Sequence, residues 1–295
     1  MSLSSLKARL GAAAAGWAPA FARAGAATAA LRQPRERLRI GLAPGRVVIA
    51  RDGGMLSARP PRAGSIAVEP HAGLPRWQPA VDALAAALTQ PGTAKCRATV
   101  ILSSHFARYA VLPWNATLKN DEEWRAYAQH RLQAVHGSVI EDWELRVCET
   151  APRGARIACA VDRALLDALE AAVAGNGGRL ESVQPYLMSA FNRARLATDA
   201  SCWFVVEEPG RLTLALIEDG TWRSVRGRRV DSRWRHALAD ILERESAALG
   251  LERPCTDVVI HAEAGPAAGS HDGLRVRDLA AGIADDERAL AMVLR

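Results

Sequence analysis

The pair of side chains that most resembles a catalytic arrangement is Ser104 next to His105, with Tyr109 close behind them. A serine beside a histidine could supply a nucleophile and its base. Adjacent residues of a strand point to opposite faces, so these two side chains can meet only if the chain turns here. No G-x-S-x-G surrounds Ser104 to place it on a nucleophile elbow. We therefore interpret Ser104 as a turn residue and predict no catalytic residue.

Metal and phosphate motifs are not found in the sequence. It contains no G-x-x-x-x-G-K-[ST] and no H-E-x-x-H. His130 and His136 are six residues apart, so on a helix they would lie on different faces. No two of the five cysteines have a C-x-x-C spacing, and we expect them to be small buried apolar residues in a reducing compartment. The sequence therefore predicts neither a metal site nor a cofactor.

The densest basic run consists of six arginines, with Trp222 and Trp234 interleaved: Arg223, Arg226, Arg228, Arg229, Arg233 and Arg235. Such a run could bind phosphates while the tryptophans stack on bases, which would make the protein a nucleic-acid binder. The alternative is a solvated strand edge whose charges prevent aggregation. We favour the edge, because no RNA-binding signature accompanies the run, and predict no specific nucleic-acid partner.

Tryptophan is unusually frequent for this composition, at eight residues against three tyrosines and four phenylalanines. Trp114, Trp124 and Trp143 all lie near one stretch of the chain. Tryptophan is common in cores and also serves as an interface anchor, and for any one of the three we favour the core. Trp114 follows Pro113 at the end of an expected strand, where exposure is favoured. Trp114 and Trp124 are therefore our candidate partner-binding residues.

The elements that must position these residues follow a repeated order. In the first copy, the pattern predicts strands at 38–42, 45–51 and 65–69, a helix at 77–88 and a strand at 98–103. In the second copy, it predicts strands at 202–207, 212–217 and 222–225, a helix at 231–249 and a strand at 257–261. Strand–strand–strand–helix–strand thus occurs twice, at 37–103 and at 201–261, which indicates a duplicated α/β architecture.

The stretch between the copies has a different order. We expect a strand at 106–112, a helix to about 136 capped by Asp121, and strands at 144–149 and 155–161. A helix capped by Asp162, a strand at 180–183 and a helix at 186–196 follow. Helices and strands of this kind over 119–198 predict an inserted small α+β subdomain.

The overall composition and the two ends of the chain limit the class of protein further. The chain has 295 residues, 49% hydrophobic and 24% charged, which suits about two globular domains. Its net charge of +6 permits contact with nucleic acid or acidic lipid without requiring it. Residues 1–36 are rich in Ala, Gly and Arg, and we expect a flexible or weakly helical arm rather than a secretory signal. After 261 we expect a strand at 274–277 and a final helix from residue 285.

This order resembles the actin-like ATPase superfamily, and its inserted subdomain resembles the arrangement of FtsA and PilM. The segments that carry the resemblance to PilM-like and GspL-like proteins are ATVILSSHFARYAVLPW (98–114), RIACAVDRALLDALEAAVAGNGGRLESVQPYLMSAFNRAR (156–195), WFVVEEPGRLTLALIEDGTWRSVRGRRV (203–230), VVIHAEAGPAAG (258–269) and the ending DDERALAMVLR. It implies two actin-like (ribonuclease H-like) β-β-β-α-β halves at 37–118 and 199–295, with the insertion at 119–198 between them.

The chain departs from the ATP-binding members at each nucleotide segment. Those members hold phosphates and magnesium with one Asp-x-Gly hairpin in each half. Here Ala43 stands where the first aspartate belongs, and Pro44 removes an N–H donor. The second hairpin reads Glu208-Pro209-Gly210, and the adenosine loop Ala262-Glu263-Ala264-Gly265 keeps one glycine of a pair. The resemblance therefore implies a fold without a productive ATP site.

The resemblance implies a non-catalytic cytoplasmic scaffold of a type IV pilus or type II secretion assembly. Such proteins bind the cytoplasmic tail of an inner-membrane partner in a groove beside the inserted subdomain, and Trp114 and Trp124 would flank it here. GspL-like proteins continue into a transmembrane helix, whereas this sequence stops at Arg295, so we expect it to be peripheral to the inner membrane through its partner. The alternative is a divergent ATPase or small-molecule kinase of the same superfamily, for which Glu208 is the remaining acidic residue.

Overall fold

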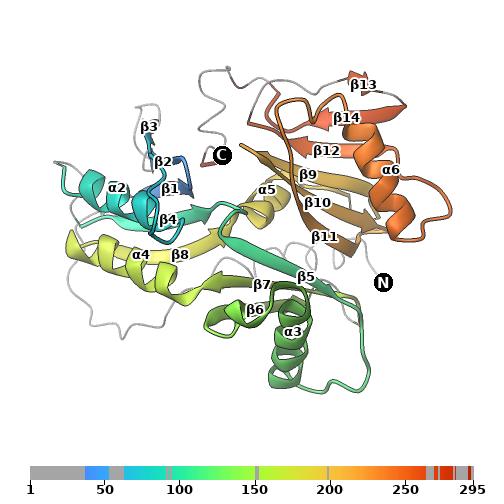
Figure 1. The fold of residues 1–295 in the computed structure, drawn as a ribbon, viewed down its shortest axis with the longest axis horizontal. Helices are drawn as coiled ribbons and strands as arrows, with labels where there is room; N and C mark the ends of the chain where they lie inside the picture. Colours follow the sequence, from blue (N-terminus) through green and yellow to red (C-terminus); the bar gives the residue numbers. More distant parts are fainter. Residues whose placement is uncertain are drawn as a thin grey trace, which may run out of the picture.

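The structure is a computed structural model that describes residues 37–52, 63–90, 93, 95–149, 153–197, 199–263, 269–271, 273–281, 283 and 292–293. The expected arm at 1–36 and the expected helix from residue 285 lie outside these residues, as do Ala264 and Gly265. Three sheets make up the described part, and Figure 1 shows the two larger ones on either side of a central helix.

The first sheet has the strand order β3-β2-β1-β4-β8. Its strands are β1 (Arg37–Ala43), β2 (Arg46–Asp52), β3 (Ala63–Ala67), β4 (Arg97–Leu102) and β8 (Arg179–Pro185). The first three form an antiparallel meander, while β4 runs parallel to β1 and β8 runs parallel to β4. The turn at Pro44-Gly45 joins β1 to β2 as expected, since proline and glycine suit a tight reversal.

The second sheet repeats this topology in the order β11-β10-β9-β12-β14-β13. Its strands are β9 (Cys202–Glu208), β10 (Arg211–Glu218), β11 (Thr221–Arg229), β12 (Asp257–His261), β13 (Gly269–His271) and β14 (Leu274–Asp278). Again three antiparallel strands are followed by parallel ones, β12 beside β9 and β14 beside β12. The duplicated α/β architecture expected from the sequence is therefore confirmed.

The small sheet has the order β5-β7-β6, with β5 (Ala107–Leu112), β6 (Trp143–Glu149) and β7 (Arg156–Asp162). Sheet membership differs from the expected 119–198 insertion at both ends. Strand β5, before residue 119, pairs with β7 and belongs to the small sheet. Strand β8, inside 119–198, pairs with β4 and lies at the edge of the first sheet. Strand pairing over this sequence distance is not visible in local hydrophobic periodicity.

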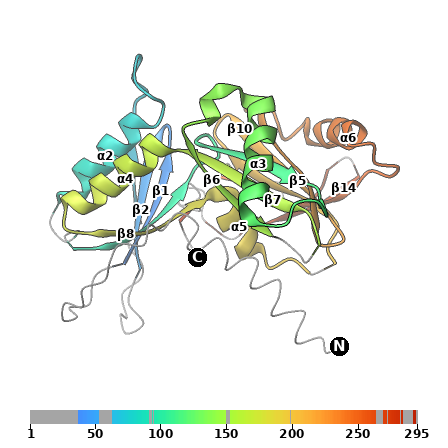
Figure 2. The ribbon, with the colours of Figure 1, turned by 90° about the horizontal axis from the view of Figure 1, so that it is seen from below.

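The helices cover these sheets and join them. Helices α2 (Gln78–Leu88) and α4 (Arg163–Gly175) lie side by side on the first sheet, and α6 (Leu238–Ala248) lies on the second (Figures 1 and 2). Helix α5 (Tyr186–Ala194) lies between the two large sheets, and its buried residues join one core that continues from Val100 of the first sheet to Phe204 of the second. Helix α3 (Asp121–His136) and the 3-10 turn η1 (Ser138–Ile140) complete the small-sheet core.

Two helix starts differ from expectation. Helix α3 is capped by Asn120, whose side chain accepts a hydrogen bond from Glu123 N at 2.9 Å, so Asp121 is the first helical residue instead of the cap. The long helix expected at 231–249 begins at Leu238, because residues 231–238 form successive i→i+3 bonds instead of the α-helical pattern. Asp162 caps α4 as expected, accepting from Ala164 N at 2.9 Å.

The described residues contain no helix with both the length and the apolar character needed to cross a bilayer. All five cysteines are free; Cys96, Cys159 and Cys202 are buried, and Cys148 and Cys255 are half-buried.

Candidate functional site

The two halves meet where their equivalent turns face each other. In the first half, Ala43 pairs with Arg46 across the β1–β2 hairpin, and in the second half Glu208 pairs with Arg211 across the β9–β10 hairpin. The equivalent strand registers therefore place Arg46 and Arg211 at corresponding positions. By the same alignment, Ile101 of β4 corresponds to His261 of β12, so Ser103 corresponds to Glu263. Each hairpin lies against the segment that follows the fourth strand of the other half.

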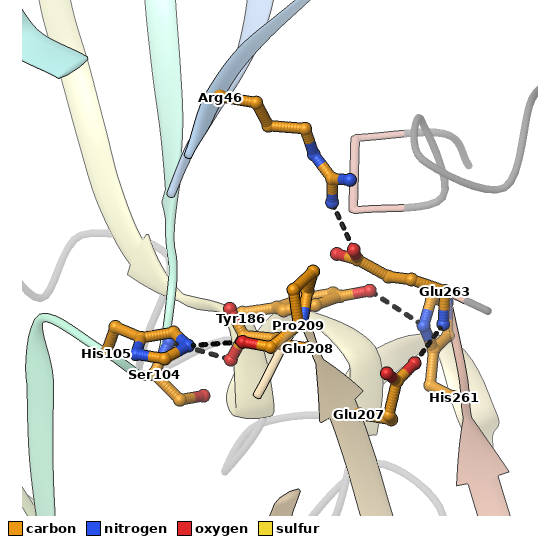
Figure 3. A network of polar contacts seen from close by, with 9 residues as sticks. All are labelled: Arg46, Ser104, His105, Tyr186, Glu207, Glu208, Pro209, His261 and Glu263. Carbon is orange, nitrogen blue, oxygen red and sulfur yellow. Dashed lines mark hydrogen bonds and ion pairs between the residues drawn. The ribbon is translucent and has the colours of Figure 1, made fainter. Parts of the chain in front are cut away.

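These contacts across the junction are reciprocal (Figure 3). The first hairpin contributes Arg46, which forms an ion pair with Glu263 after β12. The second hairpin contributes Glu208, whose carboxylate accepts from Ser104 N at 2.9 Å, just after β4. Beside it, His105 Nε2 donates to the carbonyl oxygen of Pro209 at 3.1 Å. The second half therefore supplies both carboxylates of the junction, and the first half supplies their partners Arg46 and Ser104.

Both carboxylates are almost completely excluded from solvent. Glu208 is 1% exposed, and burial raises its pKa, while hydrogen bonds from Ser103 and Ser104 oppose the shift. Burial likewise raises the pKa of Glu263 to about 8, with the Arg46 guanidinium acting in the opposite direction. Burying a carboxylate is costly unless it is paired or protonated, so these contacts hold the two halves in one arrangement.

A second set of bonds supports the Glu263 side of the junction. Glu263 N donates to a carboxylate oxygen of Glu207 at 2.8 Å, which fixes the segment after β12. The phenol of Tyr186, the first residue of α5, hydrogen-bonds with His261 Nδ1 at 2.8 Å, and both residues are buried. Helix α5 is thereby tied to the second half at the same place (Figure 3).

The side chains at this junction do not fit a magnesium–triphosphate group, which the nucleotide-binding members of this fold would hold here. Ala43 offers no oxygen ligand, Glu208 is engaged by Ser104, and Glu263 is paired with Arg46. A Cβ at Gly41 on β1 would lie 3.1 Å from side-chain atoms of Met292 and Val293, so these two residues also pack against the first hairpin strand.

Ser104 and His105 lie in the corner between β4 and β5, as expected. His105 N donates to Ser103 Oγ at 3.1 Å, which is a turn stabilised by a serine side chain. The imidazole is directed to Pro209 instead of Ser104, and burial lowers its pKa to about 4. A base of such low proton affinity does not activate a serine. Sequence reasoning identified Ser104 as a turn residue but did not foresee its contact with Glu208.

Comparison with solved structures defines the class of the fold. The cytoplasmic domain of EpsL, an inner-membrane component of the type II secretion system of Vibrio cholerae, matches with a TM-score of 0.56 and 13% identity over 88% of this chain and 92% of that chain. The PilM–PilN type IV pilus biogenesis complex matches with a TM-score of 0.55 and 14% identity over 83% and 89% of the two chains.

A Bacteroides thetaiotaomicron protein of unknown function with an actin-like ATPase fold matches with a TM-score of 0.55 and 10% identity over 87% of this chain and 95% of that chain. The chain thus has the actin-like ATPase fold, and its resemblance to PilM-like and secretion-system proteins is confirmed at the level of the fold. No protein-family model matches the sequence, and neither does any curated protein.

The two candidate tryptophans stack on each other but differ in exposure. Their ring centroids lie 6.1 Å apart at an interplanar angle of 28°. Trp114 is 41% exposed and borders a shallow pocket together with Ala116, Leu118, Lys119 and Arg153. Trp124 is 1% exposed and belongs to the small-sheet core, with the Arg156 guanidinium 4.4 Å from its ring centroid. Of the two tryptophans, only Trp114 is exposed to solvent.

One pocket is lined by residues of both the small sheet and the first sheet. Its lining comes from β6, α4 and β8: Glu144, Arg146, Arg163, Leu166, Asp167, Glu170, Leu180 and Val183. We name it the β6–β8 groove. Both strands are edges of their sheets, so each has one side without a strand partner among the described residues. Neither Trp114 nor Trp124 lines this groove.

The arginine run lies on and just after the edge strand β11. Arg226 and Arg228 pair with Glu245 of α6, at 3.6 and 3.4 Å, and Arg223 pairs with Glu218 at 3.0 Å. Trp222 and Trp234 are buried and are not available to stack on bases. In the described residues no group of three or more His, Cys, Asp or Glu side chains is arranged to hold a metal ion.

Proposed function

We propose that this chain is a non-catalytic scaffold of a type IV pilus or type II secretion assembly, and that it binds the cytoplasmic tail of an inner-membrane partner. The observation that carries the proposal is the β6–β8 groove, which is lined by residues of two edge strands, β6 of the small sheet and β8 of the first sheet, together with helix α4. The structural neighbours named above, EpsL and the PilM–PilN complex, come from assemblies of these two kinds.

The groove suits an extended peptide. An edge strand offers main-chain N–H and C=O groups to which a further strand can be added, while side-chain pockets select the sequence. Its lining includes three apolar residues, of which Leu166 and Leu180 are half-buried and Val183 is buried. Glu144 at the wall forms ion pairs with Arg146 at 2.9 Å and Arg163 at 3.1 Å. Apolar anchors flanked by polar residues are therefore what the groove would bind.

Trp114 remains a proposed contact residue, on a different surface of the small sheet. Its exposed indole is held in place by the stack on buried Trp124, so little conformational entropy would be lost when a partner covers it. A tail long enough to leave the groove could reach this surface. Trp124 would act only by positioning Trp114.

The proposal that the protein is not an enzyme rests on the junction. Its carboxylates are buried; Glu263 is paired with Arg46, and one oxygen of Glu208 accepts from Ser104 N, where a nucleotide-binding member would need free ligands. The alternative, a divergent ATPase or small-molecule kinase, would have to use Glu208, whose raised pKa is typical of a group that could act as a general acid or base. In the scaffold proposal the protein is cytoplasmic and reaches the inner membrane through its partner.

The test is affinity capture of partners from solubilised native membranes with the tagged full chain. Mass spectrometry should identify an inner-membrane protein with a cytoplasmic N-terminal segment, and a synthetic peptide of that segment should bind in solution. We expect Leu166→Ala or Leu180→Ala to weaken peptide binding, because truncating a central anchor typically costs ~2 kcal/mol, about thirtyfold in affinity. Trp114→Ala tests the second surface.

Leu74→Ala is the matched control, because Leu74 is 45% exposed and lines neither surface. Its peptide affinity should equal that of the unmodified protein. If no inner-membrane protein is captured, the scaffold proposal fails. If one is captured and Leu166→Ala and Leu180→Ala bind its tail normally, the scaffold remains but the groove is not the binding site.

A further inference from the structure

A second pocket lies at one end of the small sheet, around the exposed indole of Trp114. We name it the Trp114 pocket. Its lining consists of Trp114, Ala116, Leu118, Lys119 and Arg153, and its volume is about 470 Å³. Pockets of this size are typical of sites for small ligands, and they also have room for a side chain of a partner protein.

The strand register of the small sheet explains why these residues meet. Leu112, the last residue of β5, pairs with Arg156, the first residue of β7. Trp114 follows Leu112 by two residues, and Arg153 precedes Arg156 by three. The segment after β5 and the turn before β7 therefore lie at the same end of the sheet.

The segment that follows Trp114 is held by its own hydrogen bonds. Asn115 Oδ1 accepts from Thr117 N at 2.9 Å and from Thr117 Oγ1 at 2.7 Å. Lys119 Nζ donates to the carbonyl oxygen of Ala116 at 2.6 Å, which directs the ammonium group back over this segment. A surface that is already ordered loses little conformational entropy when a partner covers it.

Both charged residues of the lining are cations. Lys119 and Arg153 are exposed, and neither forms an ion pair with a carboxylate in the part of the chain that the structure describes. The β6–β8 groove differs in this respect, because three carboxylates line it beside its arginines: Glu144, Asp167 and Glu170. The Trp114 pocket is therefore complementary to a negatively charged ligand.

The acidic residues that come next in the chain take part in other contacts. Glu123 accepts hydrogen bonds from Lys119 N and, through Oε1 at 3.0 Å, from Asn120 Nδ2, so its carboxylate belongs to the capping of α3. Asp121 forms an ion pair with Arg156 at 3.4 Å. These carboxylates stabilise the start of α3 and are not part of the pocket lining.

We propose that the Trp114 pocket binds an acidic segment of the partner, in which a carboxylate lies beside an apolar or aromatic side chain. The apolar side chain covers the exposed indole of Trp114, and the carboxylate pairs with Lys119 and Arg153. This inference rests on the proposed function, in which the partner is an inner-membrane protein and Trp114 is a contact residue outside the β6–β8 groove.

An acidic membrane surface is the other occupant that a tryptophan between cations can bind. A bilayer is broad, however, and would also approach the exposed side chains of Asp121 and Glu122 at the start of α3. Like charges would then repel each other. A single acidic side chain can enter the pocket without approaching these residues, so the charges on this surface favour a peptide.

The test uses the full chain and two dye-labelled synthetic peptides. The acidic probe is Gly-Glu-Phe-Glu-Gly, and the neutral probe has glutamine at both glutamate positions. Fluorescence anisotropy measures affinity, and the indole N–H signal of Trp114, assigned by NMR with Trp114→Phe, reports where a probe binds. We expect the acidic probe to shift this signal and to bind about fivefold more tightly than the neutral probe, because exposed ion pairs contribute little each.

Arg153→Gln and Lys119→Gln should each weaken binding of the acidic probe about threefold and leave binding of the neutral probe unchanged. Lys95→Gln is the matched control. Lys95 is an exposed cation whose φ of 58° is close to the 57° of Arg153, and it lines neither the Trp114 pocket nor the β6–β8 groove. This control should bind the acidic probe as the unmodified protein does.

The proposal is overturned if the acidic probe binds no more tightly than the neutral one, or if Lys95→Gln weakens its binding as much as Arg153→Gln. It is also overturned if Leu166→Ala, in the β6–β8 groove, weakens this binding and Arg153→Gln does not. Binding to phosphatidylglycerol vesicles that Arg153→Gln weakens, without binding of the acidic probe, would assign the pocket to a lipid surface instead. Because the probes are synthetic, a failure to capture a membrane protein would overturn the proposed function and leave the charge preference of the pocket intact.

Discussion

Arg46, at the start of β2, forms an ion pair with Glu263, which lies 217 residues later in the chain and just after β12. The side chains are 17% and 5% exposed, so the pair is largely removed from water. It connects the first hairpin of one half to the second half, at the point where related folds would hold a nucleotide. The stability of the junction should therefore depend on both partners.

Replacing Arg46 by Gln should destabilise the protein strongly at high pH. The variant leaves the Glu263 carboxylate buried without its cation, and breaking a buried pair in this way costs about 3 kcal/mol. Urea unfolding at pH 9 measures the loss. At pH 5 the cost should be much smaller, because Glu263 can then be protonated.

The matched control for this variant is Arg97→Gln. Arg97 and Glu181 form an ion pair at 3.0 Å with side chains 41% and 34% exposed, so its loss should cost less than about 1 kcal/mol at either pH. Equal destabilisation by the two variants would contradict the buried character of the Arg46–Glu263 pair.

The pH dependence of the unfolding free energy should reflect the ionisation of Glu263. Burial raises its pKa from an ordinary 4.5 to about 8, so the folded protein holds this proton more tightly than the unfolded chain does. The resulting stabilisation is complete below about pH 4.5 and is lost as the pH rises towards 8. Glu208 shifts in the same direction. Glu263→Gln should flatten the decline in unfolding free energy between pH 5 and 8, and an unchanged slope would rule out Glu263 as its source.

The two stacked tryptophans should differ in their effect on folding. Trp124 is 1% exposed, and truncating a buried tryptophan typically costs 3–5 kcal/mol, whereas Trp114 is 41% exposed and its truncation should cost less than about 1 kcal/mol. Thermal unfolding of Trp124→Ala and Trp114→Ala compares them. Similar losses would mean that Trp114 is more important to the small-sheet core than its exposure indicates.

Most of the fold could be predicted from the sequence because its helices, strands and turns are determined by residues that are close together in the chain. The hairpins have turn residues at Pro44-Gly45 and Pro209-Gly210, and the helices have apolar residues at helical spacing, such as Val81, Leu84 and Leu88 in α2. The repeated order of elements then indicated a duplication. These features depend on neighbours within one turn or one hairpin.

Other features depend on long-range pairing and could not be predicted. The placement of β8 beside β4, instead of in the small sheet, is decided by pairing between distant strands. The burial of Trp124 is decided by how α3 packs on the small sheet. Glu263 was singled out as a departure from a glycine-rich loop, but nothing local indicated that Arg46 would meet its carboxylate.

The arginine run should show no specific affinity for nucleic acid. Arg223, Arg226 and Arg228 already pair with carboxylates of the protein, and the interleaved tryptophans are buried. Any binding of single-stranded RNA or DNA should be weak and should fall steeply as salt rises from about 50 to 200 mM. Fluorescence anisotropy with labelled oligonucleotides checks this, and tight binding that depends on sequence and survives the higher salt would favour a nucleic-acid function.

The most direct test of the non-catalytic scaffold is calorimetric titration of the full chain with Mg-ATP, which measures whether the junction between the halves binds a nucleotide. Because Arg46, Ser104 and Glu263 occupy the positions where the phosphates and magnesium would have to bind, we expect no heat of specific binding. A dissociation constant of tens of micromolar or tighter, a binding free energy of ~6 kcal/mol or more, would contradict the non-catalytic scaffold and favour a divergent ATPase or kinase.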